Sequence, residues 1–121
     1  MENLDLACAK LGQDLAELKD NGKSVEEDVF TAALGVLDEQ GPYACFLYLQ
    51  ARECKAGKQI TECATKLLSK ILHAETNAEK PLQFLQDLAM NLDQLLFARD
   101  LLRQALIYAR YHAKARNEAE K

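Results

Sequence analysis

The chain has 121 residues, of which 49% are hydrophobic and 28% are charged, and its formal net charge is −4. This balance is typical of one ordinary globular domain and excludes an intrinsically disordered chain. Five glycines and two prolines are too few for a strand-rich fold, which needs turn residues roughly every eight to twelve positions. We therefore expect an all-α protein.

Neither a membrane span nor a secretion signal is expected from this sequence. The longest uncharged stretch, Gln40 to Ala51, is much shorter than the roughly 18 apolar residues that a membrane span requires. The N-terminus is acidic, whereas a secretion signal begins with positive charge. We therefore expect a cytoplasmic protein, in which cysteines stay reduced, buried and chemically inert. The four cysteines are Cys8, Cys45, Cys54 and Cys63.

Apolar residues recur at helical spacing from the start of the chain. The first stripe runs from Leu4 to Leu18, and we expect its helix to stop at the breaker cluster 20–23, where a glycine could form the cap. Ser24 and Glu27 have the spacing of a capping box, which predicts that a second helix begins there.

The third predicted helix begins at a glycine–proline pair. Glycine is suited to the end of one helix and proline to the first turn of the next, so Gly41-Pro42 predicts both boundaries. The third helix should run from Tyr43 to about Ala56 and end at Gly57. Its first half is apolar almost all round, which predicts a place in the middle of a bundle or against a partner chain.

Helical spacing continues to the end of the chain. It predicts a fourth helix over 60–72, a polar connector over 73–80 and a last helical region that begins at Pro81. That region either breaks near Met90-Asn91 or runs on unbroken, and its final part, 92–118, is long. The sequence therefore predicts a single helical domain over 1–121, a bundle of five or six helices with a long C-terminal helix.

No pattern of catalytic or metal-ligating residues stands out. The sequence has no nucleophile elbow, phosphate loop, dinucleotide fingerprint or zinc-protease motif. Neither His73 nor His112 has a glutamate three residues before it, as the helices of di-iron bundles have. The cysteines form no C-x-x-C pair of the kind found in zinc sites. We expect a protein that is not an enzyme and that holds no metal or cofactor.

Charge is distributed unevenly along the chain. The first 39 residues contain ten acidic and three basic residues, whereas 99–116 contains five basic residues and one acidic residue. On a helix at about 100° per residue, four of these cations fall within about 60° of one another: Arg99, Arg103, Arg110 and Lys114. We call these four residues the basic row.

The basic row has three interpretations. Such a row can neutralise the phosphates of a nucleic acid without reading its bases, and Tyr111 at its edge could stack on a base. The row could instead pair with the acidic N-terminal segment of a neighbouring copy. It could also be a solvated helix face, since cations near a helix C-terminus complement the macrodipole.

Two stretches of the sequence resemble a known family, the small all-helical subunit of the type III-B (Cmr) CRISPR effector complex. One is the helix–glycine–helix unit over 33–49 (ALGVLDEQGPYACFLYL). The other is the closing helix, which contains LLFAR at 95–99 and YARYHAKA at 108–115. The resemblance covers about residues 29–118.

The resemblance implies a non-catalytic subunit. Its copies would stack into a filament by self-association and would contact the backbone subunit and the large polymerase-like subunit. The basic row would face the phosphates of crRNA and target RNA. Lys66 and Lys70 are weaker candidates for RNA binding, because they match only a general basic surface of the family. Because the chain is acidic overall, RNA contact is expected inside an assembly, with Glu26, Glu27 and Asp28 in an end-to-end contact. The alternative is a generic helical adaptor that binds another protein.

Overall fold

The helical spacing of the apolar residues produces a bundle of α-helices. The computed structural model describes residues 3–20, 23–52, 54–72 and 80–119. Within these ranges the chain forms six helices and one short antiparallel pair of strands. The elements are α1 (Leu4–Ala16), β1 (Lys19–Asp20), β2 (Lys23–Ser24), α2 (Glu27–Gln40), α3 (Pro42–Arg52), α4 (Cys54–Leu72), α5 (Pro81–Leu88) and α6 (Leu92–Ala119). The prediction of an all-α bundle with a long C-terminal helix is confirmed.

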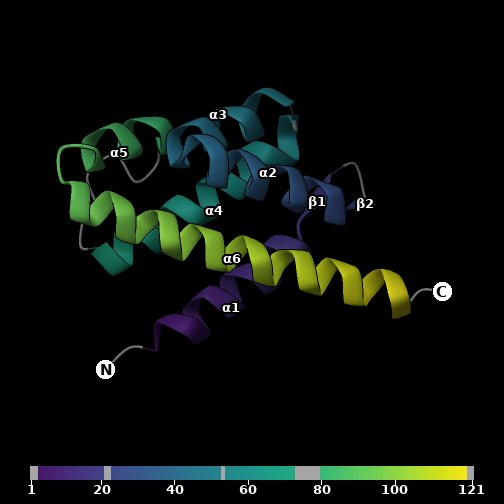
Figure 1. Ribbon diagram of the computed structural model, residues 1–121. Coiled ribbons are helices and arrows are strands. Elements are labelled where there is room, and N and C mark those ends of the chain that lie inside the picture. Colours follow the sequence, from purple (N-terminus) through teal and green to yellow (C-terminus); the bar gives the residue numbers. More distant parts are fainter. Residues whose placement is uncertain (1–2, 21–22, 53, 73–79, 120–121) are drawn as a thin grey trace.

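The last helix, α6, is the element against which the others are arranged. It is 28 residues long and runs across the molecule, with α1 crossing it on one side and α2, α3 and α5 gathered on the other (Figure 1). One face of α6 is almost completely buried, which explains why small and branched apolar residues recur along it. The buried residues are Ala98, Leu101, Leu102, Ala105, Leu106, Ala109 and Ala113.

Helix α1 approaches α6 very closely at Gly12. A Cβ atom added at Gly12 would lie 2.5 Å from the Cβ of Tyr108 and 2.8 Å from the carbonyl oxygen of Ala105. The absence of a side chain therefore sets the distance between the two helices. One turn earlier on α1, the Cys8 thiol donates to the carbonyl oxygen of Leu101 at 3.6 Å.

The rest of the core joins α2, α3, α4 and α5. Phe30 of α2, Phe46 of α3 and Phe84 of α5 are each at most 1% exposed. Burying such a side chain stabilises the fold by roughly 1.5–3 kcal/mol. Helix α4 contributes a stripe that includes Ile60 and Leu68. The apolar residues of five helices thus form one continuous cluster with those of α6.

Two predicted helix boundaries are confirmed. Gly41 ends α2 with a φ of 97°, a left-handed conformation that favours glycine. Pro42 is the first residue of α3. The last helical region breaks near Met90-Asn91, because the Asn91 side chain accepts a hydrogen bond from the backbone N–H of Gln94 at 3.2 Å and so caps α6.

The start of α2 was predicted wrongly. Helix α1 ends at Ala16 rather than at the cluster 20–23, because Lys19–Asp20 pairs with Lys23–Ser24 in the short ladder. The chain stays extended beyond Ser24, and α2 begins at Glu27 with Glu26 as its N-cap, so Ser24 is not the residue that caps this helix. Gly22, the expected helix cap, lies outside the described residues.

The end of the third helix was also predicted wrongly. Helix α3 ends at Arg52 and α4 begins at Cys54, so Gly57 lies inside α4 instead of ending α3. Gly57 is buried there, and packing outweighs its low helix propensity. Helix α3 itself has Phe46 buried and Leu47 exposed, so it is covered on one side only. Most of the expected connector, 73–79, lies outside the described residues.

Three cysteines can be placed. Cys8 and Cys45 are buried and Cys63 is partly exposed, and all three are free thiols. The Cys45 thiol donates to the carbonyl oxygen of Ala33 at 3.5 Å, and burial raises its pKa to about 12. The thiolate is the reactive form of cysteine, so Cys45 has the inert character that the sequence predicts.

A pair of glycine substitutions tests the α1–α6 contact. Gly12→Ala should destabilise the protein by about 1–3 kcal/mol or more, because its Cβ would overlap the backbone of α6. Gly35→Ala is the matched control, since Gly35 lies in α2 with nothing within 4 Å of an added Cβ. It should stabilise by about 0.5–1 kcal/mol. Urea unfolding measures both, and equal effects would contradict the assigned packing.

The buried Cys45 thiol predicts a loss of stability at alkaline pH. The thiol pKa is 9.0 in the unfolded chain and about 12 in the folded one, so the unfolded state loses its proton first. The free energy of unfolding should therefore fall as pH rises above 9, by up to about 1.4 kcal/mol per pH unit for this group. Urea unfolding of Cys45→Ala should show a shallower fall, and an equal slope would contradict the prediction.

Candidate nucleic-acid interface

The four cations of the basic row lie on the exposed side of α6. The residues that face the core of the bundle occupy the other side of this helix, so the side chains of the row remain accessible to solvent. The helical spacing of the apolar residues is what separates the two sides. Tyr111, which was expected at the edge of the row, is 60% exposed. The four cations and Tyr111 are therefore all exposed, which the sequence alone left open.

Helix α2 places carboxylates against two members of the row. Arg103 donates from Nε to Oδ1 of Asp38 at 2.9 Å, and Nε of Arg110 lies 3.6 Å from Oε1 of Glu27. Both acids belong to the acidic N-terminal third of the chain. Half of the basic row is therefore paired within the chain. Glu27, for which the sequence analysis expects an end-to-end contact with another copy, lies beside Arg110 of α6.

The other two members of the row have no carboxylate partner among the side chains that the structure describes. Arg99 and Lys114 make no ion pair with any of these side chains. They lie 15 positions apart, so about 22 Å of helix axis separates them at 1.5 Å per residue. An anionic ligand could bind these two cations without displacing a carboxylate. The two paired arginines lie between them along the helix.

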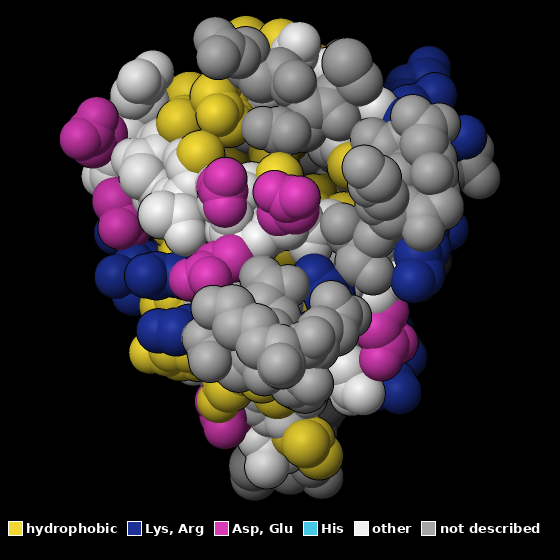
Figure 2. Space-filling view, turned by 90° about the vertical axis from the view of Figure 1, so that its right-hand side faces the viewer, with side chains coloured by type: hydrophobic (Ala, Val, Ile, Leu, Met, Phe, Trp, Pro, Cys, Tyr) yellow, Lys and Arg dark blue, Asp and Glu magenta, His cyan; other side chains and the backbone are white. Residues whose placement is uncertain are grey.

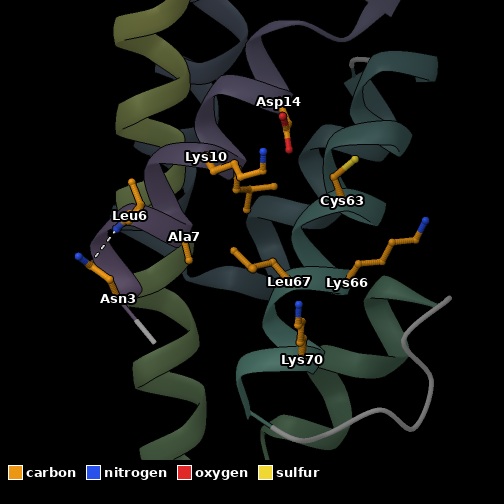
Figure 3. Close-up of a pocket in the computed structure, with 10 residues that line it drawn as sticks. Asn3, Leu6, Ala7, Lys10, Asp14, Cys63, Lys66, Leu67 and Lys70 are labelled. Atoms are coloured by element: carbon orange, nitrogen blue, oxygen red, sulfur yellow. Dashed lines mark hydrogen bonds between the residues drawn. The ribbon is translucent and has the colours of Figure 1, made fainter. Parts of the chain in front are cut away.

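Lys66 and Lys70 do not join the basic row. Both lie on α4 and line a groove between α1 and α4, together with Lys10 (Figure 3). None of the four row residues lines this groove. The sequence groups the six cations only by charge, and the fold separates them into two surfaces.

Cations and anions are interspersed on one face of the molecule. On the face seen from the end where α6 finishes, Lys and Arg side chains form separate groups with Asp and Glu side chains between them (Figure 2). This pattern agrees with the pairing of Arg103 and Arg110. Because charges of both signs are interspersed, the positive electrostatic potential of this face is lower than its number of cations alone suggests. Its attraction for a polyanion such as RNA is correspondingly weaker.

Arg116 has a structural role that the sequence analysis missed. Its guanidinium donates to the carbonyl oxygens of Ala16 and Val25, the latter at 2.8 Å. It thereby joins the end of α6 to the end of α1 and to the residue after β2. A signal was present in the sequence: Arg116 follows the buried Ala109 by seven residues and Ala113 by three, so it falls on the core stripe of α6.

At the other end of the same contact, α6 and α1 are joined by a tyrosine. The Tyr108 hydroxyl donates to Oδ1 of Asp5 at 2.7 Å. This hydrogen bond raises the pKa of Tyr108, because it is made by the protonated form. Together with Arg116 it fixes the rotation of α6 relative to α1, and this rotation decides which cations face outward.

Comparison with known proteins assigns no family. No family model, no curated protein and no solved structure matches this chain. Among the described residues, no group of three or more His, Cys, Asp and Glu side chains could hold a metal ion. None of the helices in the described ranges is long and apolar enough to cross a membrane. The function must therefore be argued from the surfaces of the chain.

Replacement of Arg116 should affect stability. Arg116→Ala leaves two backbone carbonyl groups without their charged donor, and we expect a loss of about 1.5–3 kcal/mol. Arg99→Ala removes the same side chain from an exposed position of the same helix and should change stability by less than about 0.5 kcal/mol. Thermal or urea unfolding compares them, and two equal values would contradict the structural role of Arg116.

Proposed function

We propose that this chain is a non-catalytic subunit of an RNA-guided assembly and that its basic row contacts the RNA backbone. The observation that carries the proposal is the exposed face of α6, on which Arg99 and Lys114 have no carboxylate partner in the described chain. Cations on a rigid helix contact phosphates irrespective of base sequence. Tyr111, exposed on the same helix, adds a ring on which a base can stack.

The two ion pairs of the basic row reduce the affinity for RNA only slightly. The side chains of Arg103 and Asp38 are each 49% exposed, and an exposed ion pair contributes about 0–1 kcal/mol. A phosphate can therefore replace the carboxylate of Asp38 or Glu27 at little cost. The exchange nevertheless lowers the net gain from Arg103 and Arg110 relative to Arg99 and Lys114.

The overall charge favours RNA contact within an assembly. A chain with a net charge of −4 is unlike a free nucleic-acid binder, which is usually basic. Linked to other RNA-binding subunits, however, a weak contact is strengthened by a high effective concentration. The chain would then position RNA that other subunits hold, and it would not capture RNA by itself.

The more specific form of the proposal is the small subunit of a type III-B (Cmr) CRISPR complex. It is supported by the resemblance of two stretches. One is 33–49, which comprises the second half of α2, Gly41 and most of α3, and the other is 95–115, which lies in α6. In this form the partners are further copies of the chain, the backbone subunit, the large polymerase-like subunit, and crRNA with its target RNA.

The RNA contact predicts a salt-dependent affinity that depends on the unpaired cations. For single-stranded RNA, the slope of log K against log salt should be about −0.7 for each phosphate contacted. Arg99→Gln with Lys114→Gln should make the slope shallower by about 1.4. Fluorescence polarisation with a labelled oligouridylate at increasing salt measures this slope.

Two further variants serve as controls for the RNA experiment. Lys55→Gln with Lys58→Gln changes the net charge equally on exposed positions of α4 and should leave the slope unchanged. Asp38→Asn, which frees Arg103, should strengthen binding. Equal slopes for the row variant and the α4 control would show that the basic row is not the RNA surface.

Exposed apolar residues favour a second candidate function, a helical adaptor for another protein. Tyr43 and Leu47 of α3 are 40% and 48% exposed, and a shallow groove of about 310 Å³ lies beside them between α2 and α3. Clustered exposed apolar residues often mark protein contacts. Protein binding that persists after complete RNA digestion and is lost in Leu47→Asp would favour the adaptor over the RNA contact.

A further inference from the structure

An open groove lies between α1 and α4. It has a volume of about 590 Å³, and apolar side chains from both helices line it, among them Leu6, Leu11 and Leu67, which we call its apolar floor. Leu67 of α4 points toward α1 in Figure 3. Leu6 is 65% exposed, although an apolar side chain of this size gains about 1.5–3 kcal/mol from burial. A partner that covers Leu6 would recover part of that free energy.

Three lysines stand around this apolar floor. Lys10 comes from α1, and Lys66 and Lys70 come from α4, all three exposed. None of them makes an ion pair with a described residue, and Asp14 is the only carboxylate in the described lining. The rim therefore has an excess of positive charge, which complements an acidic ligand.

The shape of the groove fits a helix better than a small molecule. The lining residues of α1 extend from Asn3 to Asp14, which is about 16 Å at 1.5 Å per residue. This length accommodates about three turns of a second helix. A small-molecule pocket encloses roughly 70–90% of its ligand, whereas the exposed Leu6 leaves this groove open along one side.

The charge and the floor together exclude simpler occupants. A nucleic-acid backbone would use the lysines but would leave the apolar floor uncovered. A purely apolar helix would use the floor but would leave the lysine charges beside it without compensation. Both features are used by an amphipathic helix that has leucine-like residues at i, i+3 or i+4 and i+7 on one face and carboxylates along its two edges.

We propose that the α1–α4 groove binds an acidic amphipathic helix of a partner protein. The partner's apolar face would cover Leu6 and Leu67, and its carboxylates would pair with Lys66 and Lys70 on one edge and with Lys10 on the other. This site goes beyond the proposed RNA contact and does not depend on it, because none of the basic row residues lines the groove.

A synthetic peptide tests the groove directly. The probe is a labelled helix of about 14 residues, stapled to stay helical, with leucines at i, i+3 and i+7 and glutamates on both flanks. We expect micromolar binding to the full chain by fluorescence polarisation. Lys66→Glu with Lys70→Glu should weaken it at least about tenfold by placing like charges together. Leu6→Asp should weaken it similarly, and because Leu6 is 65% exposed, this substitution leaves the core packing of the fold intact.

Matched control variants distinguish binding in the groove from non-specific electrostatic and hydrophobic binding elsewhere on the surface. Lys55→Glu with Lys58→Glu reverses two exposed charges of the same helix outside the groove, and Leu92→Asp changes an exposed leucine of α6. Both should bind like the unchanged chain. Cys63 lines the groove, so bound peptide should also slow its alkylation by N-ethylmaleimide.

Several results would overturn the proposal. One is the absence of peptide binding, and another is binding that both groove variants leave unchanged. Self-association of the chain that is abolished by Leu6→Asp and competes with the peptide would show that the occupant is a second copy. Stoichiometric binding of palmitate without binding of the peptide would make the groove a site for an anionic amphiphile. None of these results would bear on the RNA contact of α6.

Discussion

The close contact between α1 and α6 at Gly12 is the constraint on which the arrangement of this protein depends. Tyr108 and the backbone of α6 occupy the space where any side chain at position 12 would lie, so the two helices approach to a distance that only glycine permits. Arg116 and Tyr108 then hold α6 in one rotation about its axis. That rotation determines which residues of α6 enter the core and which cations reach solvent.

The same packing also limits the charge that α6 presents. Helix α2 buries Phe30 and Leu37 in the core, and its polar side carries Glu27 and Asp38 to two of the arginines. The acidic N-terminal third and the basic C-terminal helix are far apart in the sequence. The fold brings them together, so that carboxylates of α2 neutralise two of the arginines of α6. An RNA contact through α6 would therefore be weak and easily reversed, which suits a subunit that positions RNA held by others more than one that captures it.

Much of the fold could be predicted from local patterns, and much of the candidate site could not. Helical spacing and the pair Gly41-Pro42 indicate helices and boundaries because these depend on neighbouring residues. The prediction of a helix start at Ser24 was wrong, because Lys23–Ser24 pairs with Lys19–Asp20 in a short antiparallel ladder that keeps the chain extended there. The Arg103–Asp38 pair joins residues 65 positions apart, and the separation of Lys66 from the basic row likewise follows from helix packing. Neither has a local signal.

The most direct test of the proposed role is purification of the native assembly from cells with this chain as bait, followed by mass spectrometry of the proteins and sequencing of the bound RNA. The account predicts repeat-flanked guide RNA together with a backbone subunit and a large polymerase-like subunit, and cross-links from RNA to α6. A stable protein partner without RNA would contradict it, and the basic row would then be a solvated face of the last helix.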